Sequence, residues 1–203
     1  MENEIRGLYC GFQQSGKTTT TKSNFWDTKT ESKTTQKFSF VFSDKKDTAY
    51  VNAAQNIEVK WLNENQILPH LSWGNNQIVF ESTNYAAYIN INSDTSDIWA
   101  VLMNYKIGNG PGNQSVLTNG TRKIDILKAT SNKNGEDKRS IPASGFEFSE
   151  EGKPLAALQY YGGGMLGNNK NIVWLHRGMD ERMKLIMSAA ATAILQVFMD
   201  RVE

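Results

Sequence analysis

The sequence is poor in the residues from which most catalytic and metal sites are built. It has one cysteine, Cys10, and two histidines, His70 and His176, among 203 residues. A single cysteine excludes an internal disulfide, and neither histidine has a partner at metal-ligand spacing, so we expect no metal site. GxSxG and HExxH motifs and paired carboxylates are also missing. The sequence therefore predicts a protein that is not an enzyme and uses no cofactor.

The sequence also lacks an excess of charge of either sign and has no long apolar run. The formal net charge is +1, and no apolar run reaches the length of a transmembrane segment. The N-terminal segment, MENEIRGLYC, lacks the apolar stretch of a signal peptide. We therefore expect a reducing, intracellular compartment and no secretion. Hydrophobic residues make up 39% of the chain, enough for the core of one domain.

A phosphate-loop pattern, GxxxxGK[ST], is matched from Gly11 to Thr18. Such a loop holds phosphate only when a strand precedes it and a helix follows it. The following segment, TTTTKSNFWDTKTESKTT, is dominated by threonine and serine, which are poor helix formers. KIDILK is also a poor match to the strand that usually supplies the magnesium-binding aspartate. We interpret the match as fortuitous and expect a polar hairpin loop here.

Alternating apolar residues predict strands along most of the chain. KFSFVFS places Phe38, Phe40 and Phe42 on one face, and NIEVKWLN does the same with Ile57, Val59 and Trp61. The segments QIVFES, AAYININ, RKIDILKA, GFEFSE, LAALQYYG and NIVWLHR have the same extended character. The sequence thus predicts an antiparallel, strand-rich domain.

Two segments have helical periodicity. NSDTSDIWAVLMNYKIGNG opens with capping residues and continues with Ile98, Val101, Leu102 and Tyr105, which predicts a helix of about three turns. A buried strand from Ile98 to Met103 is the alternative. MDERMKLIMSAAATAILQVFMDRVE predicts a C-terminal helix about 30 Å long, with an apolar stripe and an opposite polar stripe.

This order of elements predicts one domain of two similar halves, about 36–106 and 121–203, preceded by a basic, threonine-rich arm or hairpin at 1–35. Each half would have about four strands followed by a helix. The apolar stripe of the C-terminal helix, including Met187, Ala189, Ala191 and Phe198, offers more apolar surface than a small sheet needs. We therefore predict a homo-oligomer assembled through this helix.

Two copies of four strands plus a helix resemble the Whirly family of single-stranded-DNA-binding proteins. The most specific part of the resemblance is NIVWLHRGMDERMKLIMSAAATAILQVFMDR, which is similar to that family's last strand and helix. EGKPLAAL, from Glu151 to Leu158, is similar to the family's KGKAAL strand but lies in the second half, so it carries no predicted contacts. The resemblance implies an α+β fold of two antiparallel four-stranded sheets packed together, each half ending in a helix, and binding of single-stranded nucleic acid.

The same C-terminal segment, MDERMKLIMSAAATAILQVFMD, also resembles the last helix of the tubby-like and phospholipid-scramblase superfamily. That resemblance implies a tubby-like β-barrel with a central helix and a phosphoinositide- or membrane-binding module. The polar stripe of the helix argues against full enclosure in a barrel. A structural or assembly protein without a ligand is a third possibility.

Cations and aromatic residues cluster in residues 5–46, which contain eight cations and three carboxylates and so have a net charge of +5. Aromatic stacking and basic backbone contacts hold single-stranded nucleic acid. We therefore predict a non-catalytic protein that binds single-stranded nucleic acid, DNA in preference to RNA. Because alternation places Lys60 and Trp61 on opposite faces, both contact one ligand only if a bulge or a neighbouring strand contributes. The predicted contact residues are Lys17, Lys22, Phe25, Trp26, Lys29, Lys33, Lys37, Lys60, Trp61, Arg122 and Lys123.

Overall fold

The computed structural model describes residues 9–23, 29–44, 46–62, 66–68, 71–72, 77–107, 115–130, 142–163 and 171–199. Their main element is one ten-stranded antiparallel sheet in the order β1-β2-β3-β6-β7-β8-β9-β10-β11-β12. Strands β4 and β5 pair separately, and α1 follows β12. The bounds are β1 (Tyr9–Ser23), β2 (Lys29–Ser43), β3 (Thr48–Leu62), β4 (Gln66–Leu68), β5 (Leu71–Ser72), β6 (Gln77–Ile91), β7 (Ile98–Ile107), β8 (Ser115–Thr118), β9 (Lys123–Thr130), β10 (Ser144–Glu150), β11 (Lys153–Tyr161), β12 (Ile172–Leu175) and α1 (Glu181–Met199).

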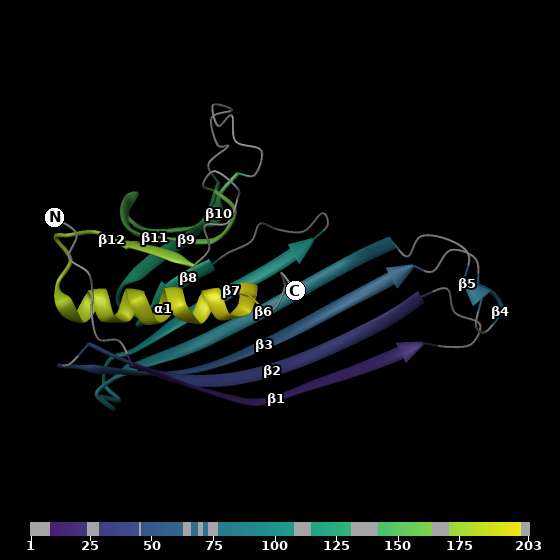
Figure 1. Cartoon of the computed structure of the whole chain (residues 1–203), viewed down its shortest axis with the longest axis horizontal. Coiled ribbons are helices and arrows are strands. Elements are labelled where there is room, and N and C mark those ends of the chain that lie inside the picture. The colour runs from purple at the N-terminus through teal and green to yellow at the C-terminus, as the bar shows by residue number, and fades with distance from the viewer. Residues whose placement is uncertain are drawn as a thin grey trace.

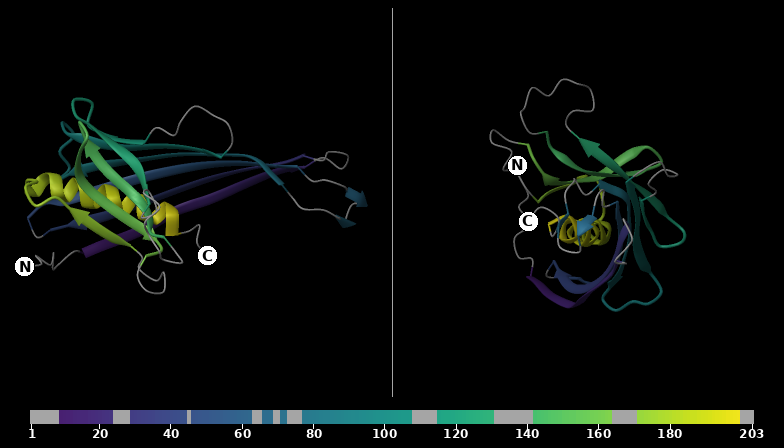
Figure 2. Two further views of the ribbon diagram at one scale, coloured as in Figure 1. Left: turned by 90° about the horizontal axis from the view of Figure 1, so that it is seen from above. Right: turned by 90° about the vertical axis from the view of Figure 1, so that its right-hand side faces the viewer.

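The sheet curls around α1. The helix contacts β2, β3 and β6 on one side and β11 and β12 on the other, so strands from both ends of the sheet reach it. Seen along the helix, the strands form an arc with α1 on its concave side (Figure 2). Strands β1 and β12 are the two edges of this sheet. The concave face and the helix therefore enclose the core, and the opposite, convex face points outward.

The predicted alternation in β2 is confirmed, because Phe38, Phe40 and Phe42 are all buried on the concave face. They pack against a helix whose small residues, Ala189–Ala191 and Ala193, are fully buried. Small side chains let the helix approach the sheet closely. Met187 and Ala189–Ala191, from the apolar stripe that we expected to build an oligomer, are thus covered within the chain, and the oligomeric state stays a prediction.

The polar stripe of α1 does not leave the helix open to solvent on one side. Lys184, Ser188, Thr192 and Gln196 are each half-buried, and Glu181 is the exposed residue of the described helix. The helix begins at Asp180, whose carboxylate Oδ1 accepts a 2.8 Å hydrogen bond from the backbone N–H of Met183. That bond satisfies one of the free N–H groups of the first turn.

The prediction of two four-stranded sheets, each half ending in a helix, is wrong. All ten strands of the main sheet are hydrogen-bonded in one order, and the helix predicted near residues 95–107 is the strand β7. The arrangement that the Whirly resemblance implied is therefore not the fold of this chain. The final helix is confirmed, and so are the predicted strands of the second half, which are β9, β10, β11 and β12.

Strand β7 was open to a helical interpretation because both of its faces are apolar. Trp99, Val101 and Met103 are buried against the core, while Ile98 and Leu102 lie on the convex face and are partly exposed. Apolar residues on both faces remove the period-two contrast and create three- and four-residue spacings by coincidence. The expected helix cap is instead a turn, in which Ser96 donates both its backbone N–H and its hydroxyl to Asp94 Oδ1.

Four strands of 15 residues, β1, β2, β3 and β6, run past the C-terminal end of α1 and extend from the body of the molecule (Figure 1). We call their far ends, which include Ser23, Lys29, Leu62 and Gln77, the distal extension. Within residues 1–35, which we expected to form an arm or hairpin, residues 9–23 and 29–35 belong to β1 and β2. The described part of the predicted basic segment therefore belongs to the main sheet.

Candidate functional site

The phosphate-loop pattern lies within β1. Gly11 pairs with Val41 and Thr18 with Thr35 of β2, with a register shift between Gln14 and Gly16. The segment is thus an extended strand followed by another strand, and it lacks the loop and helix N-terminus on which phosphate binding by this motif depends. The geometry agrees with a fortuitous match.

Four of the predicted contact lysines lie on the convex face of the sheet. Lys33 and Lys37 alternate with the buried residues of β2, and Lys60 occupies the equivalent outward position on β3. Lys22 is opposite Glu31, and directly opposed residues share a face, so it lies on the convex face as well. Neighbouring strands therefore bring together cations that are far apart in sequence.

Two carboxylates lie among these lysines. Lys33 Nζ is 3.1 Å from Glu31 Oε1 and 3.9 Å from Glu58 Oε2, and Lys60 Nζ is 3.1 Å from Glu58 Oε1. The hydrogen bond from Lys33 lowers the pKa of Glu31, and the same bond raises the pKa of Lys33. The distal part of the convex face consequently carries charges of both signs, from Lys22, Lys33 and Lys60 and from Glu31 and Glu58.

Arg122 and Lys123 lie elsewhere, across the sheet beside the start of α1. Arg122 forms a bidentate pair with Glu150, with Nε–Oε1 and Nη2–Oε2 distances of 2.9 and 2.8 Å, and stands 5.8 Å from the centre of the Trp99 ring. The hydrogen bond from Arg122 lowers the pKa of Glu150. Lys123 Nζ is 2.8 Å from Asp125 Oδ1. Both cations are therefore engaged in ion pairs within the protein: the Arg122 pair joins β10 to the turn before β9, whereas the Lys123 pair is exposed and lies within β9.

Arg182 of the first turn of α1 is bound in the same way. Its Nη2 lies 3.1 Å from Asp97 Oδ2 and 3.6 Å from Asp94 Oδ2, in the turn between β6 and β7. Asn119 donates a 2.9 Å hydrogen bond to Asp97 Oδ1 and is the main cause of that carboxyl group's lowered pKa. Together with the 3.7 Å contact between Arg122 Nη1 and Met183 Sδ, these contacts attach the beginning of the helix to two parts of the sheet.

The other predicted residues are placed by their backbone or not at all. Lys17 lies in β1 opposite Gln36, Lys29 begins β2, and Trp61 lies near the end of β3. Phe25 and Trp26 fall outside the described residues. The described structure therefore brings together Lys22, Lys33, Lys37 and Lys60, and places Arg122 and Lys123 apart from them.

The sequence interpretation missed the aromatic residues that the convex face exposes. Tyr50 of β3 is 41% exposed and Tyr88 of β6 is 54% exposed. Tyr50 is opposite Asn90 and Tyr88 is opposite Asn52, so the two tyrosines are diagonal neighbours on one face. Ile98 and Leu102 of β7 extend this surface. We call these four residues the tyrosine patch; alternation within YVNAAQN and AAYININ could have revealed its tyrosines.

A line of polar side chains crosses the same face. Thr35, Asn56, Asn84 and Asn104 lie directly opposite one another on β2, β3, β6 and β7, and we call them the amide row. Thr35 Oγ1 donates to Asn56 Oδ1 at 2.9 Å, and Asn104 Nδ2 donates to Asn84 Oδ1 at 2.9 Å. The row separates the tyrosine patch from the charged distal extension.

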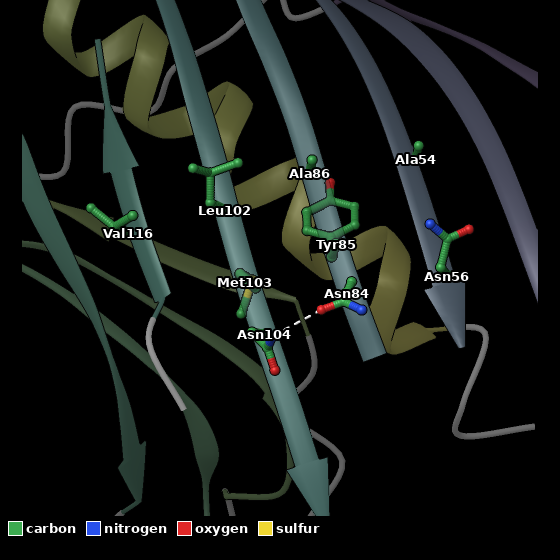
Figure 3. Close-up of a pocket in the computed structure, with 9 residues that line it drawn as sticks. All are labelled: Ala54, Asn56, Asn84, Tyr85, Ala86, Leu102, Met103, Asn104 and Val116. Carbon is green, nitrogen blue, oxygen red and sulfur yellow. Dashed lines mark hydrogen bonds between the residues drawn. The ribbon is translucent and has the colours of Figure 1, made fainter. Parts of the chain in front are cut away.

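A shallow depression of about 470 Å³ lies beside the amide row. Its lining includes Ala54 and Ala86, whose short side chains leave space between the amide row and Tyr88. The close-up shows Asn56, Asn84 and Asn104 on the side of the strands that faces away from α1 (Figure 3). In contrast, the Tyr85 hydroxyl points to the helix and donates to the Ala193 carbonyl oxygen at 3.0 Å.

Charge is scarce on this part of the convex face. Val41, Tyr50, Asn90 and Ile98 lie opposite one another on β2, β3, β6 and β7. Between this row and the amide row, Lys37 is the one residue of these four strands with a formal charge. Among the described residues, no three His, Cys, Asp or Glu side chains gather to hold a metal ion. None of the helices in the described part of the chain combines the length and apolar character needed to cross a bilayer.

No protein-family model, curated protein or solved structure matches this chain.

Proposed function

We propose that the protein is a non-catalytic binding protein for single-stranded nucleic acid, and that the convex face of its sheet is the binding surface. The observation that supports this proposal most strongly is that exposed tyrosines, amide side chains and lysines all project from one exposed face. Tyr50 and Tyr88 come from β3 and β6, whereas Lys33 and Lys37 come from β2. Neighbouring strands thus place lysines and aromatic side chains on one face, whereas alternation within one strand puts adjacent residues such as Lys60 and Trp61 on opposite faces.

Each group has a role in such binding. Bases stack on exposed aromatic rings, which contributes roughly 1–3 kcal/mol per base. Side-chain amides both donate and accept hydrogen bonds, so the exposed Asn52, beside the tyrosines, suits the polar edges of bases. Lys37 and the distal lysines suit the phosphate backbone. The surface around the tyrosine patch, where Lys37 is the one charged residue, would hold the bases, and the charged rows beyond the amide row would follow the phosphates.

The charge on this surface sets how strongly binding depends on salt. On β1, β2 and β3, the cluster of Lys22, Lys33, Lys37 and Lys60 is accompanied by Glu31 and Glu58, and these six side chains carry a net charge of +2. Each phosphate contact to a single strand changes the logarithmic salt slope by about −0.7, so two to four contacts predict a slope of about −1 to −3. Binding should therefore be weak at high salt.

Fluorescence anisotropy of labelled oligo-dT and oligo-U across salt concentrations tests the proposal. Tyr88→Ala should weaken binding by about fivefold to a hundredfold with an unchanged slope, because stacking is not ionic. Tyr161→Ala is the matched control, since Tyr161 is also exposed, at 38%, but lies on β11, across the sheet. Equal losses in both variants would place the ligand elsewhere.

Two further results would overturn the proposal. Failure to bind either oligonucleotide at low salt excludes it outright. Pelleting with phosphoinositide vesicles, without oligonucleotide binding, would favour the membrane-binding alternative. Because one fold supports many functions, the curled sheet around a helix does not by itself decide between these ligands.

A further inference from the structure

Asn56 and Asn84 face each other across β3 and β6, in the middle of the amide row. Side chains that are directly opposed in an antiparallel pair have Cβ atoms about 5 Å apart. Both residues are exposed on the convex face. Their terminal amide groups therefore border one small gap above the sheet.

The hydrogen bonds on either side set how these two amides are turned. Asn56 accepts through Oδ1 from Thr35, on the β2 side, and Asn84 accepts through Oδ1 from Asn104, on the β7 side. Both carbonyl oxygens therefore point away from the gap. The nitrogen of each side chain points toward the other residue, as Figure 3 shows.

Two NH₂ groups cannot bond to each other, because each nitrogen of a side-chain amide is only a donor. Asn56 and Asn84 make their hydrogen bonds within the described structure through their Oδ1 atoms. The gap thus presents N–H donors from two strands to whatever lies above it. An acceptor with several oxygen atoms satisfies this arrangement best.

The charges near the gap favour a negatively charged acceptor. Lys37 lies on the same face, opposite Ala54 and diagonal to Asn56. Unlike Lys33 and Lys60, it makes no ion pair within the described residues. The carboxylate of Glu58, one row away, is already held by Lys33 and Lys60 at 3.9 and 3.1 Å. The depression beside Ala54 and Ala86 provides space for a tetrahedral group.

We propose that Asn56 and Asn84 together bind a phosphate group between their facing amides, with Lys37 as its counter-charge. This inference rests on the proposed function and makes it more specific, because it names one backbone phosphate of the bound strand and the residues that hold it. Bases on the tyrosine patch and a phosphate at this gap would lie on one continuous path across β3 and β6.

The first test uses inorganic phosphate with the intact protein and no nucleic acid. In ¹⁵N–¹H spectra, phosphate should shift the side-chain NH₂ signals of Asn56 and Asn84 in a saturable way, and an equal ionic strength of chloride should not. The NH₂ signals of Asn52, on the same strand and face, should stay unchanged. Absence of any shift at Asn56 and Asn84 would overturn the site, even if the protein binds oligonucleotides.

The second test uses Asn56→Asp, which keeps the shape of the side chain but replaces donors by a negative acceptor. Loss of a hydrogen bond to a charged group should weaken oligo-dT binding by about tenfold to a hundredfold. The slope with salt should flatten by about 0.7, the value of one phosphate contact. Asn171→Asp adds the same charge at an exposed position directly before β12, the other edge of the sheet, and should leave the affinity and the slope unchanged.

The two tests also separate this inference from the proposed function. Equal effects of Asn56→Asp and Asn171→Asp on affinity and slope would overturn the phosphate site and leave nucleic-acid binding intact. Phosphate-dependent shifts at Asn56 and Asn84 without oligonucleotide binding would support the site and overturn the proposed function. In that case, binding to phosphoinositide vesicles that Asn56→Asp abolishes would identify a lipid headgroup as the source of the phosphate.

Discussion

Tyr85 offers a direct test of how β6 packs against α1. Its side chain is 4% exposed, and its hydroxyl donates a 3.0 Å hydrogen bond to the Ala193 carbonyl oxygen. Tyr85→Phe retains the ring and removes only that bond. A buried neutral hydrogen bond contributes about 1 kcal/mol, so the free energy of unfolding at neutral pH should fall by about this amount. For a chain of this length, the melting temperature should fall by about 2–4 °C.

At alkaline pH, the parent protein should lose its advantage in stability over Tyr85→Phe. Burial raises the pKa of Tyr85 well above its usual 10.0. Its stabilising contribution is therefore complete below about pH 10 and is lost as the pH rises further, because only the unfolded chain can then ionise. At about pH 11 this ionisation lowers the free energy of unfolding by about 1.4 kcal/mol. Phenylalanine does not ionise, so at this pH the free energy of unfolding of the variant should equal or exceed that of the parent protein.

Urea unfolding, followed by tryptophan fluorescence at several pH values, gives both free energies. All other ionisable groups are common to the two proteins and cancel in the difference between them. Tyr161→Phe, at an exposed position, should show almost no difference at any pH. A difference for Tyr85→Phe that stays constant from neutral to alkaline pH would refute burial of this hydroxyl under the helix.

Two further predictions concern packing and ion pairs. Ala190→Leu adds carbon atoms where the side chain has no exposed surface, so the free energy of unfolding should fall by about 1–3 kcal/mol. Gln196→Leu, on the half-buried stripe of the same helix, should change the stability far less. Equal effects of the two variants in thermal unfolding would contradict the enclosure of the helix. Arg122 holds the pKa of Glu150 below its usual value, so this pair stabilises the fold above about pH 4.5 and the contribution is lost as the pH falls through the folded-state pKa. Glu150→Gln should therefore cost no more than about 1 kcal/mol at neutral pH, since the pair is partly exposed, and should weaken the acid dependence of unfolding; an unchanged acid-unfolding curve would count against the pair.

The parts of the fold that the sequence predicts correctly are those with a strong contrast between a buried and an exposed face. Phe38, Phe40 and Phe42 alternate with polar residues, so β2 is recognisable from its pattern alone. The C-terminal helix is equally clear, because its apolar residues recur at helical spacing and Asp180 begins it. Such contrasts depend on local sequence and require no knowledge of the partners in space.

The features that sequence alone could not predict depend on contacts between distant segments. Both faces of β7 are apolar, so its pattern fits a helix as well as a strand, and pairing with β6 and β8 decides between them. The number of sheets also depends on long-range contacts, because it is set by whether each new strand pairs with the existing sheet or begins a second one. The amide row was invisible for the same reason, since Asn56, Asn84 and Asn104 are brought into line only by the register of three strands.

The register that builds the core also builds the convex face. On β3, Ala49, Val51 and Ala53 point to the helix, while Tyr50 and Asn52 point outward. A slip of one residue would exchange these two sets, exposing the apolar residues and burying a tyrosine and an asparagine. Packing of α1 against β3 opposes that slip and thereby keeps the outward residues in line with their neighbours on β2 and β6. Because the outward side chains take no part in that packing, they can be replaced singly without loss of the fold, which is the condition that the proposed binding tests require.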